Sequence, residues 1–332
     1  MEPALKPQPS NPSGLPSSRV KLSLVVPVLN EQAAVPRFVA RLREVLGPLS
    51  PEIRYEILFV NDGSTDATEF VVRSLMQGDP AIRLINLSRN FGKDAALCAG
   101  LEHAAGDAVI PIDVDLQDPP EVIPEMVAKW QRGAKVVNAR REDRPHDSRI
   151  KRLTAGAFYR TFNALADTPI PSNVGDFRLL DRQVVEILRS LGERTRFNKA
   201  LFSWVGFETD EVSFQRPPRS LGETSWNYWK LWNFALDGIF TSSTRPLRVW
   251  SYAGVAMAGL GFLYAAFIFA LTILGFGRTP GYASTVILIS VFGGLQLLAI
   301  GIVGEYVGRI FTEVRARPLY IVRSMHGDRE AT

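Results

Sequence analysis

Two long uncharged stretches near the end of the chain constrain its fold more than any other feature. Residues 249–277 and 279–304 contain no Asp, Glu, Lys or Arg. Each stretch exceeds the roughly 20 apolar residues that a helix needs to cross the hydrocarbon core of a bilayer. We therefore predict a two-helix transmembrane hairpin over residues 249–309. The alternative is a pair of core helices in a soluble domain, where two adjacent uncharged runs of this length are rare.

Arginines flank the two stretches and predict their orientation. Two precede the first stretch, four follow the second and one lies between them, namely Arg245 and Arg248; Arg309, Arg315, Arg317 and Arg323; and Arg278. Because basic residues favour the cytoplasmic side of a membrane, both ends of the hairpin are expected there. The sequence thus predicts a two-span protein of the inner (cytoplasmic) membrane, with its main domain and both termini in the cytoplasm. Residues 310–332 are then a C-terminal tail.

Three further segments have a distinctive composition. Residues 1–19 are rich in Pro and Ser and predict a disordered tail. Residues 221–248 predict juxtamembrane amphipathic helices, because Trp229 and Trp232 share one apolar face of a helix over residues 226–241. A helix packed on the soluble domain is the alternative. Glycines in both spans permit close helix packing, and we expect a homo-oligomer.

Residues 20–220 have the pattern of an α/β domain. From residue 21 to 138, short apolar runs alternate with helical ones, which favours a mostly parallel, Rossmann-like sheet. Strands are predicted over residues 22–28, 55–60, 82–87, 108–112, 135–139 and 175–180, and helices near residues 149–165 and from Arg182. A polar cluster follows each of the first five strands, and ligands of such sheets bind outside the carboxyl ends of the strands. We expect these clusters to meet in one crevice.

Composition narrows the chemistry of that crevice. A single cysteine and three histidines exclude a disulfide framework and a Cys/His zinc cluster, so a divalent metal would need oxygen ligands. The net charge of +4 and the pI near 9.2 fit nucleic acid, an anionic membrane surface or a phosphate-rich ligand. The flanking arginines favour the membrane and phosphate interpretations, and no nucleic-acid partner is expected.

An acidic motif follows the fourth predicted strand and reads Asp113-Val-Asp115-Leu-Gln117-Asp118-Pro-Pro. Mg²⁺ and Mn²⁺ prefer carboxylate and other oxygen ligands together with substrate phosphates. Two aspartates one residue apart at a strand end can therefore serve a metal and a nucleotide together. The alternative is an acidic turn that caps a helix beginning at Pro119.

Other motifs occur in order along the chain: residues 25–31, 60–66, 90–93, 175–180 and 221–225, which read VVPVLNE, VNDGSTD, NFGK, GDFRLL and LGETS. With the acidic motif and the two spans, this set resembles the family 2 glycosyltransferases of the GT-A fold. Within them it is similar to the polyprenyl-phosphate glycosyltransferases, which include dolichyl-phosphate mannose synthase and the bactoprenol glucosyltransferases. One departure is Trp226, where relatives often carry Lys.

The resemblance implies a nucleotide-sugar site and a metal site. Pro27, Glu31, Asp62, Lys93 and Asp113 correspond to residues that bind the nucleotide sugar. For metal, here Mg²⁺ or Mn²⁺, the corresponding ligands are Asp113, Asp115 and Gln117. Three of the nucleotide-sugar residues also have a purely structural alternative: a strand-end turn for Pro27, a helix N-terminal acid for Glu31 and an Asx-turn for Asp62.

Positive charge is needed to bind a sugar diphosphate beside a lipid phosphate. Besides Lys93, the candidates are Arg140, Arg149, Arg152, Arg216 and Arg219. Guanidinium groups bind phosphate in a bidentate manner, and Arg140 follows a strand directly. For each arginine, a solvated surface charge is the alternative.

The catalytic residues expected from the resemblance are Asp115, Asp176 and Arg140. Asp176 corresponds to the proposed base of the family. A phosphate monoester is already largely dianionic at neutral pH, since its second pKa is roughly 6, so such an acceptor needs no strong base. Asp176 is therefore interpreted first as a residue that orients the acceptor.

The predicted function is the inverting transfer of a hexose from a nucleotide diphosphate sugar, with UDP favoured, to undecaprenyl phosphate. A processive polysaccharide synthase is one alternative, although the sequence lacks a Gln-x-x-Arg-Trp segment and two spans are few for a translocation channel. A membrane scaffold without catalytic activity is the other.

Overall fold

The computed structural model describes residues 20–49, 53–142, 163, 171, 173–193, 198–215, 243–274 and 281–327. Several predictions therefore lie outside the described residues. They are the tail over 1–19, nearly all of the helix near 149–165, the loop at 221–225 and the amphipathic helix at 226–241.

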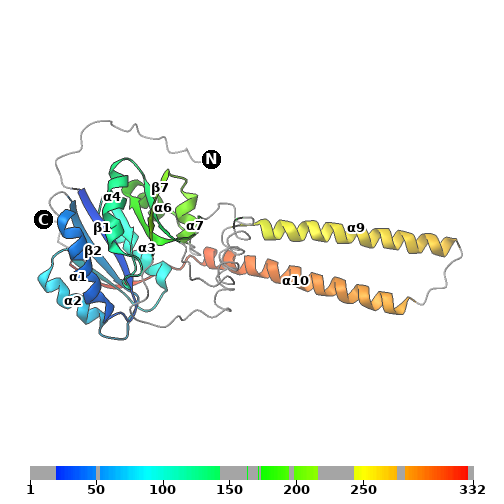
Figure 1. Cartoon of the computed structure of the whole chain (residues 1–332). Helices are drawn as coiled ribbons and strands as arrows, with labels where there is room; N and C mark the ends of the chain where they lie inside the picture. The colour runs from blue at the N-terminus through cyan, green and yellow to red at the C-terminus, as the bar shows by residue number, and fades with distance from the viewer. Residues whose placement is uncertain are drawn as a thin grey trace, which may run out of the picture.

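A β-sheet with helices packed against it forms the main domain (Figure 1). Within the described residues it has eight strands, in the order β7-β5-β6-β4-β1-β2-β3-β8. Its strands are β1 (Val20–Val28), β2 (Ile53–Asn61), β3 (Ile82–Leu87), β4 (Ala108–Pro111), β5 (Val136–Arg141), β6 (Val174–Asp181), β7 (Thr209–Phe214) and β8 (Val322–His326). The six predicted strands are confirmed, as is the predicted fold class of a mostly parallel α/β sheet followed by two long apolar helices. β7 and β8 were not predicted.

Strand direction decides which residues reach the carboxyl edge of the sheet. β1 pairs in parallel with β2 and β4, and β2 pairs in parallel with β3. β6 is antiparallel to both of its neighbours, β4 and β5. This reversal brings the beginning of β6 to the edge where β1–β4 end, so the residues after Val174 join the polar clusters of the parallel strands.

Side-chain alternation along the central strands builds an apolar cluster on each face of the sheet. In β2, Ile57 and Phe59 enter one cluster, whereas Leu58 and Val60 enter the other. The first face is covered by α1 (Ala34–Leu46), α2 (Thr68–Gly78), η2 (Pro120–Val122) and α4 (Ile123–Gln131), and η1 (Gly47–Leu49) follows α1. The second is covered by α3 (Lys93–His103), α6 (Arg182–Ser190) and α7 (Asn198–Trp204).

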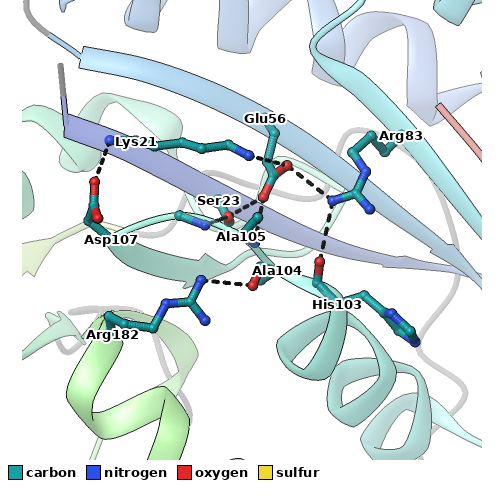
Figure 2. A network of polar contacts seen from close by, with 10 residues as sticks. Lys21, Ser23, Glu56, Arg83, His103, Ala104, Ala105, Asp107 and Arg182 are labelled. Atoms are coloured by element: carbon teal, nitrogen blue, oxygen red, sulfur yellow. Dashed lines mark hydrogen bonds and ion pairs between the residues drawn. The ribbon is translucent and has the colours of Figure 1, made fainter. Parts of the chain in front are cut away.

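A buried ion network holds the amino end of the sheet together (Figure 2). The Glu56 carboxylate in β2 is 4% exposed and accepts hydrogen bonds from Ser23 Oγ (2.5 Å) and the Ala105 backbone N–H (2.8 Å). Lys21 Nζ and Arg83 Nη1 lie 2.9 and 3.1 Å from the same carboxylate. Because a buried charge is costly unless paired, these four donors explain how Glu56 is accommodated within the sheet.

The two apolar stretches form long helices that pack antiparallel, α9 (Arg245–Ile273) and α10 (Tyr282–Arg315) (Figure 1). Residues 247–271 and 287–315 are long and apolar enough to cross a membrane, and they are not buried by protein. At the domain-proximal end of the pair, Tyr306 Oη donates to the Ser243 carbonyl at 2.7 Å. Residues 322–326, predicted as part of a tail, return to the sheet as β8 beside β3.

Candidate functional site

Five segments bring polar side chains to the carboxyl edge of the sheet. They follow β1, β2, β3 and β4 and begin β6, and they carry Glu31, Asp62, Lys93, Asp113 and Asp176. In the described part of the chain, three of the four non-glycine residues with positive φ also flank this edge, namely Asn30 (56°), Leu116 (57°) and Asn173 (63°). Such backbone conformations carry a cost and gather at functional sites, so their positions support a binding site here.

Asp62 fastens the end of β2 to the loop before α3. It is 3% exposed, and its two carboxylate oxygens accept the backbone N–H groups of Phe91 (2.7 Å) and Gly92 (2.9 Å). Burial raises the pKa of Asp62 above its ordinary value, and these hydrogen bonds offset that rise only in part. Asp62 therefore shapes the loop that carries Lys93.

Lys93 joins two predicted site residues that lie far apart in the sequence. Its Nζ lies 2.7 Å from Asp113 Oδ1 and 3.1 Å from Asp176 Oδ2. Burial lowers the pKa of Lys93, but the attraction of Asp113 and then Asp176 outweighs burial and raises the pKa. The amine is therefore charged at neutral pH. Because the side chain is 47% exposed, it can also reach a ligand at this edge.

The acidic loop after β4 turns sharply at Leu116. Asp115 Oδ1 accepts the Gln117 backbone N–H at 3.0 Å, which closes the turn around the positive φ of Leu116. Asp115 is half-buried, whereas Gln117 is 6% exposed. Asp118 is also buried and lies 3.6 Å from Arg141 Nη2.

The residues present fit a divalent metal only if the substrate supplies further oxygens. Within the described part of the chain, no three His, Cys, Asp or Glu side chains gather as a metal-binding group. Asp115 and Asp113 could supply one carboxylate each, and Mg²⁺ is commonly bound by one or two carboxylates together with substrate phosphates. Asp113 already has Lys93 as a partner, so a dication there would meet a second positive charge.

Glu31 and Pro27 lie at the end of β1. The Glu31 backbone opens α1, since its carbonyl accepts the N–H groups of Ala34 and Val35 and its own N–H donates to Thr68 Oγ1 at 2.8 Å. Pro27 lies opposite Val60 in the parallel pairing of β1 with β2. Pro27 is thus paired within the strand and does not form a turn, and α1 has no acidic residue in its first turn. A nucleoside contact of either residue stays a prediction.

The predicted phosphate-binding arginines are only partly placed. Arg140 in β5 pairs with Glu211 of β7 at 3.1 Å, and its neighbour Arg141 points to Asp118 on the opposite face. The structure thus places Arg140 against β7, not in the group around Lys93. Four candidates lie outside the described residues, namely Arg149, Arg152, Arg216 and Arg219.

Sequence reasoning gave too little weight to Arg178, two residues after Asp176. Arg178 is 2% exposed, its Nη2 donates to the Gly175 carbonyl at 2.5 Å, and its guanidinium lies 4.2 Å from the centre of the Phe202 ring. Burial lowers its pKa to about 10, opposed by Asp176. The signal in the sequence was an arginine inside an apolar strand, which must find partners when buried.

The class of protein follows from comparison with known families. The chain belongs to glycosyl transferase family 2, whose model matches residues 23–188. A second model, described as the GtrB C-terminal hairpin, matches residues 245–310. The first covers the strands that carry Asp62, Asp113 and Asp176, and the second covers most of α9 and α10.

Individual relatives are similar over nearly their whole length. A prophage-derived bactoprenol glucosyl transferase of Shigella flexneri is 50% identical over 92% of this chain and 99% of its own. An uncharacterized glycosyltransferase of Synechocystis is 50% identical over 93% of this chain and 96% of its own. Among solved structures, a mannosyltransferase from Pyrobaculum calidifontis in complex with GDP-Man and Mn²⁺ matches with 17% identity, covering 90% of this chain and 87% of the other, and a TM-score of 0.47.

Proposed function

We propose that this chain transfers a glucosyl residue from a nucleotide diphosphate, with UDP favoured, to the phosphate of a polyprenyl lipid. The observation that carries the proposal is the combination of two features in one chain: polar side chains gathered at the carboxyl edge of the sheet, and a hairpin of two long apolar helices. A nucleotide sugar would lie against the Asp62 and Lys93 loops, and the acceptor lipid would keep its hydrocarbon in the bilayer. The names of the relatives in Shigella agree with this acceptor and this sugar.

The group around Lys93 suits transfer between two phosphates. The acceptor oxygen attacks the anomeric carbon while the nucleotide diphosphate leaves from the opposite side, so the configuration inverts. Developing negative charge on the leaving group is stabilised by fixed positive charge nearby, and Lys93 supplies it. Asp115, with Gln117, would hold a divalent cation that adds to the same stabilisation.

Asp176 acts in this proposal as a positioning group. It shares the Lys93 amine with Asp113, so its carboxylate is fixed by an ion pair at the beginning of β6. The acceptor phosphate is already charged at neutral pH and needs no strong base. Asp176 thus orients Lys93 toward the reacting groups.

Membrane topology forms part of the proposal. β8 pairs with β3 and directly follows the segment that leaves α10, so both ends of the hairpin lie on the side of the main domain. The flanking arginines support a cytoplasmic location for the domain and both termini, because basic residues favour that side of a membrane. The polar edge would face lipid headgroups from that side.

A lipid-transfer assay tests the proposal. Membranes that contain the full chain are incubated with labelled UDP-glucose and undecaprenyl phosphate, and the lipid is extracted. We expect a labelled polyprenyl-phosphate sugar, with Asp115→Ala reducing its rate of formation at least about 100-fold. Glu44→Ala, which removes a surface carboxylate on α1, is the matched control and leaves the rate unchanged. Retained activity in Asp115→Ala contradicts the role of that carboxylate.

A further inference from the structure

A row of polar side chains, two of them buried and one half-buried, crosses three strands beside the loop that carries Asp62. Asn61 ends β2, Asn86 lies opposite it in β3, and Ser324 lies opposite Asn86 in β8. Asn61 and Asn86 are 2% and 0% exposed. Ser324 is separated from Asn86 by 238 positions in the sequence, and the membrane hairpin lies between them.

Hydrogen bonds run along this row without a gap. Asn61 Nδ2 donates to Asn86 Oδ1 at 2.8 Å. Asn86 Nδ2 donates in turn to Ser324 Oγ at 3.0 Å and to Glu69 Oε1 at 3.1 Å, so both of its N–H groups are used. Arg323 of β8 holds the other Glu69 oxygen at 2.6 Å. Two neighbouring residues of β8 therefore fix the amide of Asn86.

At its other end, the row holds the loop after β2. Asn61 Oδ1 accepts the Ser64 backbone N–H at 2.9 Å, and Ser64 Oγ accepts the Asn30 backbone N–H at 3.0 Å. Asp62 lies between the first two of these residues in the sequence. The loops after β1 and β2 are thus joined to each other and, through Asn86, to β8.

Polar side chains at these positions are costly for a sheet interior. A buried amide is tolerated only when its hydrogen bonds are made. Apolar residues at the same paired positions would need no hydrogen-bond partners. All the polar groups of Asn86 are directed at Asn61, Glu69 and β8, so the amide orients neighbouring groups as well as filling space.

The membrane hairpin is linked to this row by a short connection. α10 ends at Arg315 and β8 begins at Val322. In between, the Ile321 carbonyl accepts the Ser88 backbone N–H at 2.9 Å, and Tyr320 hydrogen-bonds to Glu102 of α3. The chain that leaves the membrane is therefore fixed at two points before it reaches Ser324.

We infer that β8 is a positioning element for the nucleotide donor, which acts through Asn86 and Asn61 on the Asp62 loop. Asn86 and Ser324 are positioning residues: they reach the donor site only through the loop. This inference rests on the proposed function, because it takes the Asp62 loop as part of the donor site. It predicts that changes at Ser324 and Asn86 alter donor affinity and leave the affinity for the lipid acceptor unchanged.

The test uses the full chain in detergent or membranes with three variants. Ser324→Ala and Asn86→Ala interrupt the row, and Ser324→Thr keeps the hydroxyl group. Met325→Ala is the matched control, because Met325 lies in the same strand but packs in an apolar cluster. The readouts are KM for UDP-glucose, KM for undecaprenyl phosphate, the Kd of UDP by calorimetry, and Tm.

We expect Ser324→Ala to raise the donor KM and the UDP Kd about fivefold, and Asn86→Ala about tenfold or more. The acceptor KM should stay within about twofold, and Ser324→Thr should restore the donor values. Met325→Ala should lower Tm without a change in either KM. If Asn86→Ala does not fold, the two Ser324 variants decide the outcome.

Unchanged donor KM and UDP Kd in Ser324→Ala overturn the inference, as does a parallel rise of both KM values that follows Tm. Failure of the proposed function gives a different result, namely a parent chain that forms no glycosylated lipid. In that case the UDP Kd of the parent and its variants still decides the inference, and a parent chain that does not bind UDP overturns it.

Discussion

Replacement of Glu56 by alanine should destabilise the main domain strongly without altering the chemistry at the other edge of the sheet. The carboxylate is 4% exposed and has four donors within 3.1 Å, two of them cationic. Removal of one member of a buried ion network costs about 3–5 kcal/mol, since the remaining groups stay buried without their partner. For a domain of this size each kcal/mol lowers Tm by roughly 2–4 °C, so we expect a fall of about 10 °C.

The Glu56 network also predicts the pH dependence of stability. Burial raises the pKa of Glu56, but hydrogen bonds from Ser23, Lys21 and Ala105 outweigh burial and set it below the ordinary value of 4.5. Because the folded pKa is lowered, this stabilisation is present above pH 4.5 and is lost as the pH falls through the folded pKa. Glu56→Gln should lack this part of the acid dependence.

The assay is thermal unfolding of the detergent-solubilised chain, followed by tryptophan fluorescence between pH 3 and 8, with roughly half-unit steps across the carboxylate range. Turnover per folded molecule is measured below Tm and should match the parent chain. A Glu56→Ala variant whose Tm lies within about 2 °C of the parent would refute the reasoning. A Glu56→Ala variant with the Tm of the parent chain but without turnover would instead indicate that Glu56 takes part in the reaction.

Two more substitutions test the carboxyl edge. Lys93→Met should reduce turnover about 100-fold with a small change in Tm, because it removes a half-exposed cation shared by Asp113 and Asp176. Steady-state kinetics measure the turnover and thermal unfolding measures the Tm. Unchanged turnover would exclude a catalytic role for the amine. Gly63→Ala should destabilise the protein by about 1–3 kcal/mol, since the φ of Gly63 is +75° and a Cβ there would lie 2.6 Å from the backbone of Arg89. Denaturant unfolding measures this change, and a free energy of unfolding equal to that of the parent chain would contradict the prediction.

The central strands could be predicted because their residues alternate between two apolar faces. In β2, Leu58 and Phe59 enter opposite clusters, and the polar residue Asp62 follows where the strand ends. This local pattern needs no knowledge of the neighbouring strands. The convergence of Asp62, Lys93 and Asp113 then follows from the parallel direction of β1–β4.

Other features depended on pairing between distant segments. The five residues of β8 have no alternating apolar pattern, and their partner strand precedes the membrane hairpin. The contact of Lys93 with Asp176 required the reversal of β6, which the motif alone does not reveal. Arg140 and Arg141 differ by one position and point to opposite faces, so a choice between them needs the register of β5.

The measurement that tests the central claim most directly is the transfer of labelled glucose from UDP-glucose to undecaprenyl phosphate by membranes that contain the full chain. The account predicts an extractable, labelled polyprenyl-phosphate sugar that forms at the same rate with the parent chain and with Glu44→Ala, and at least about 100-fold more slowly with Asp115→Ala. No labelled lipid from the parent chain with any nucleotide sugar in a panel would contradict it.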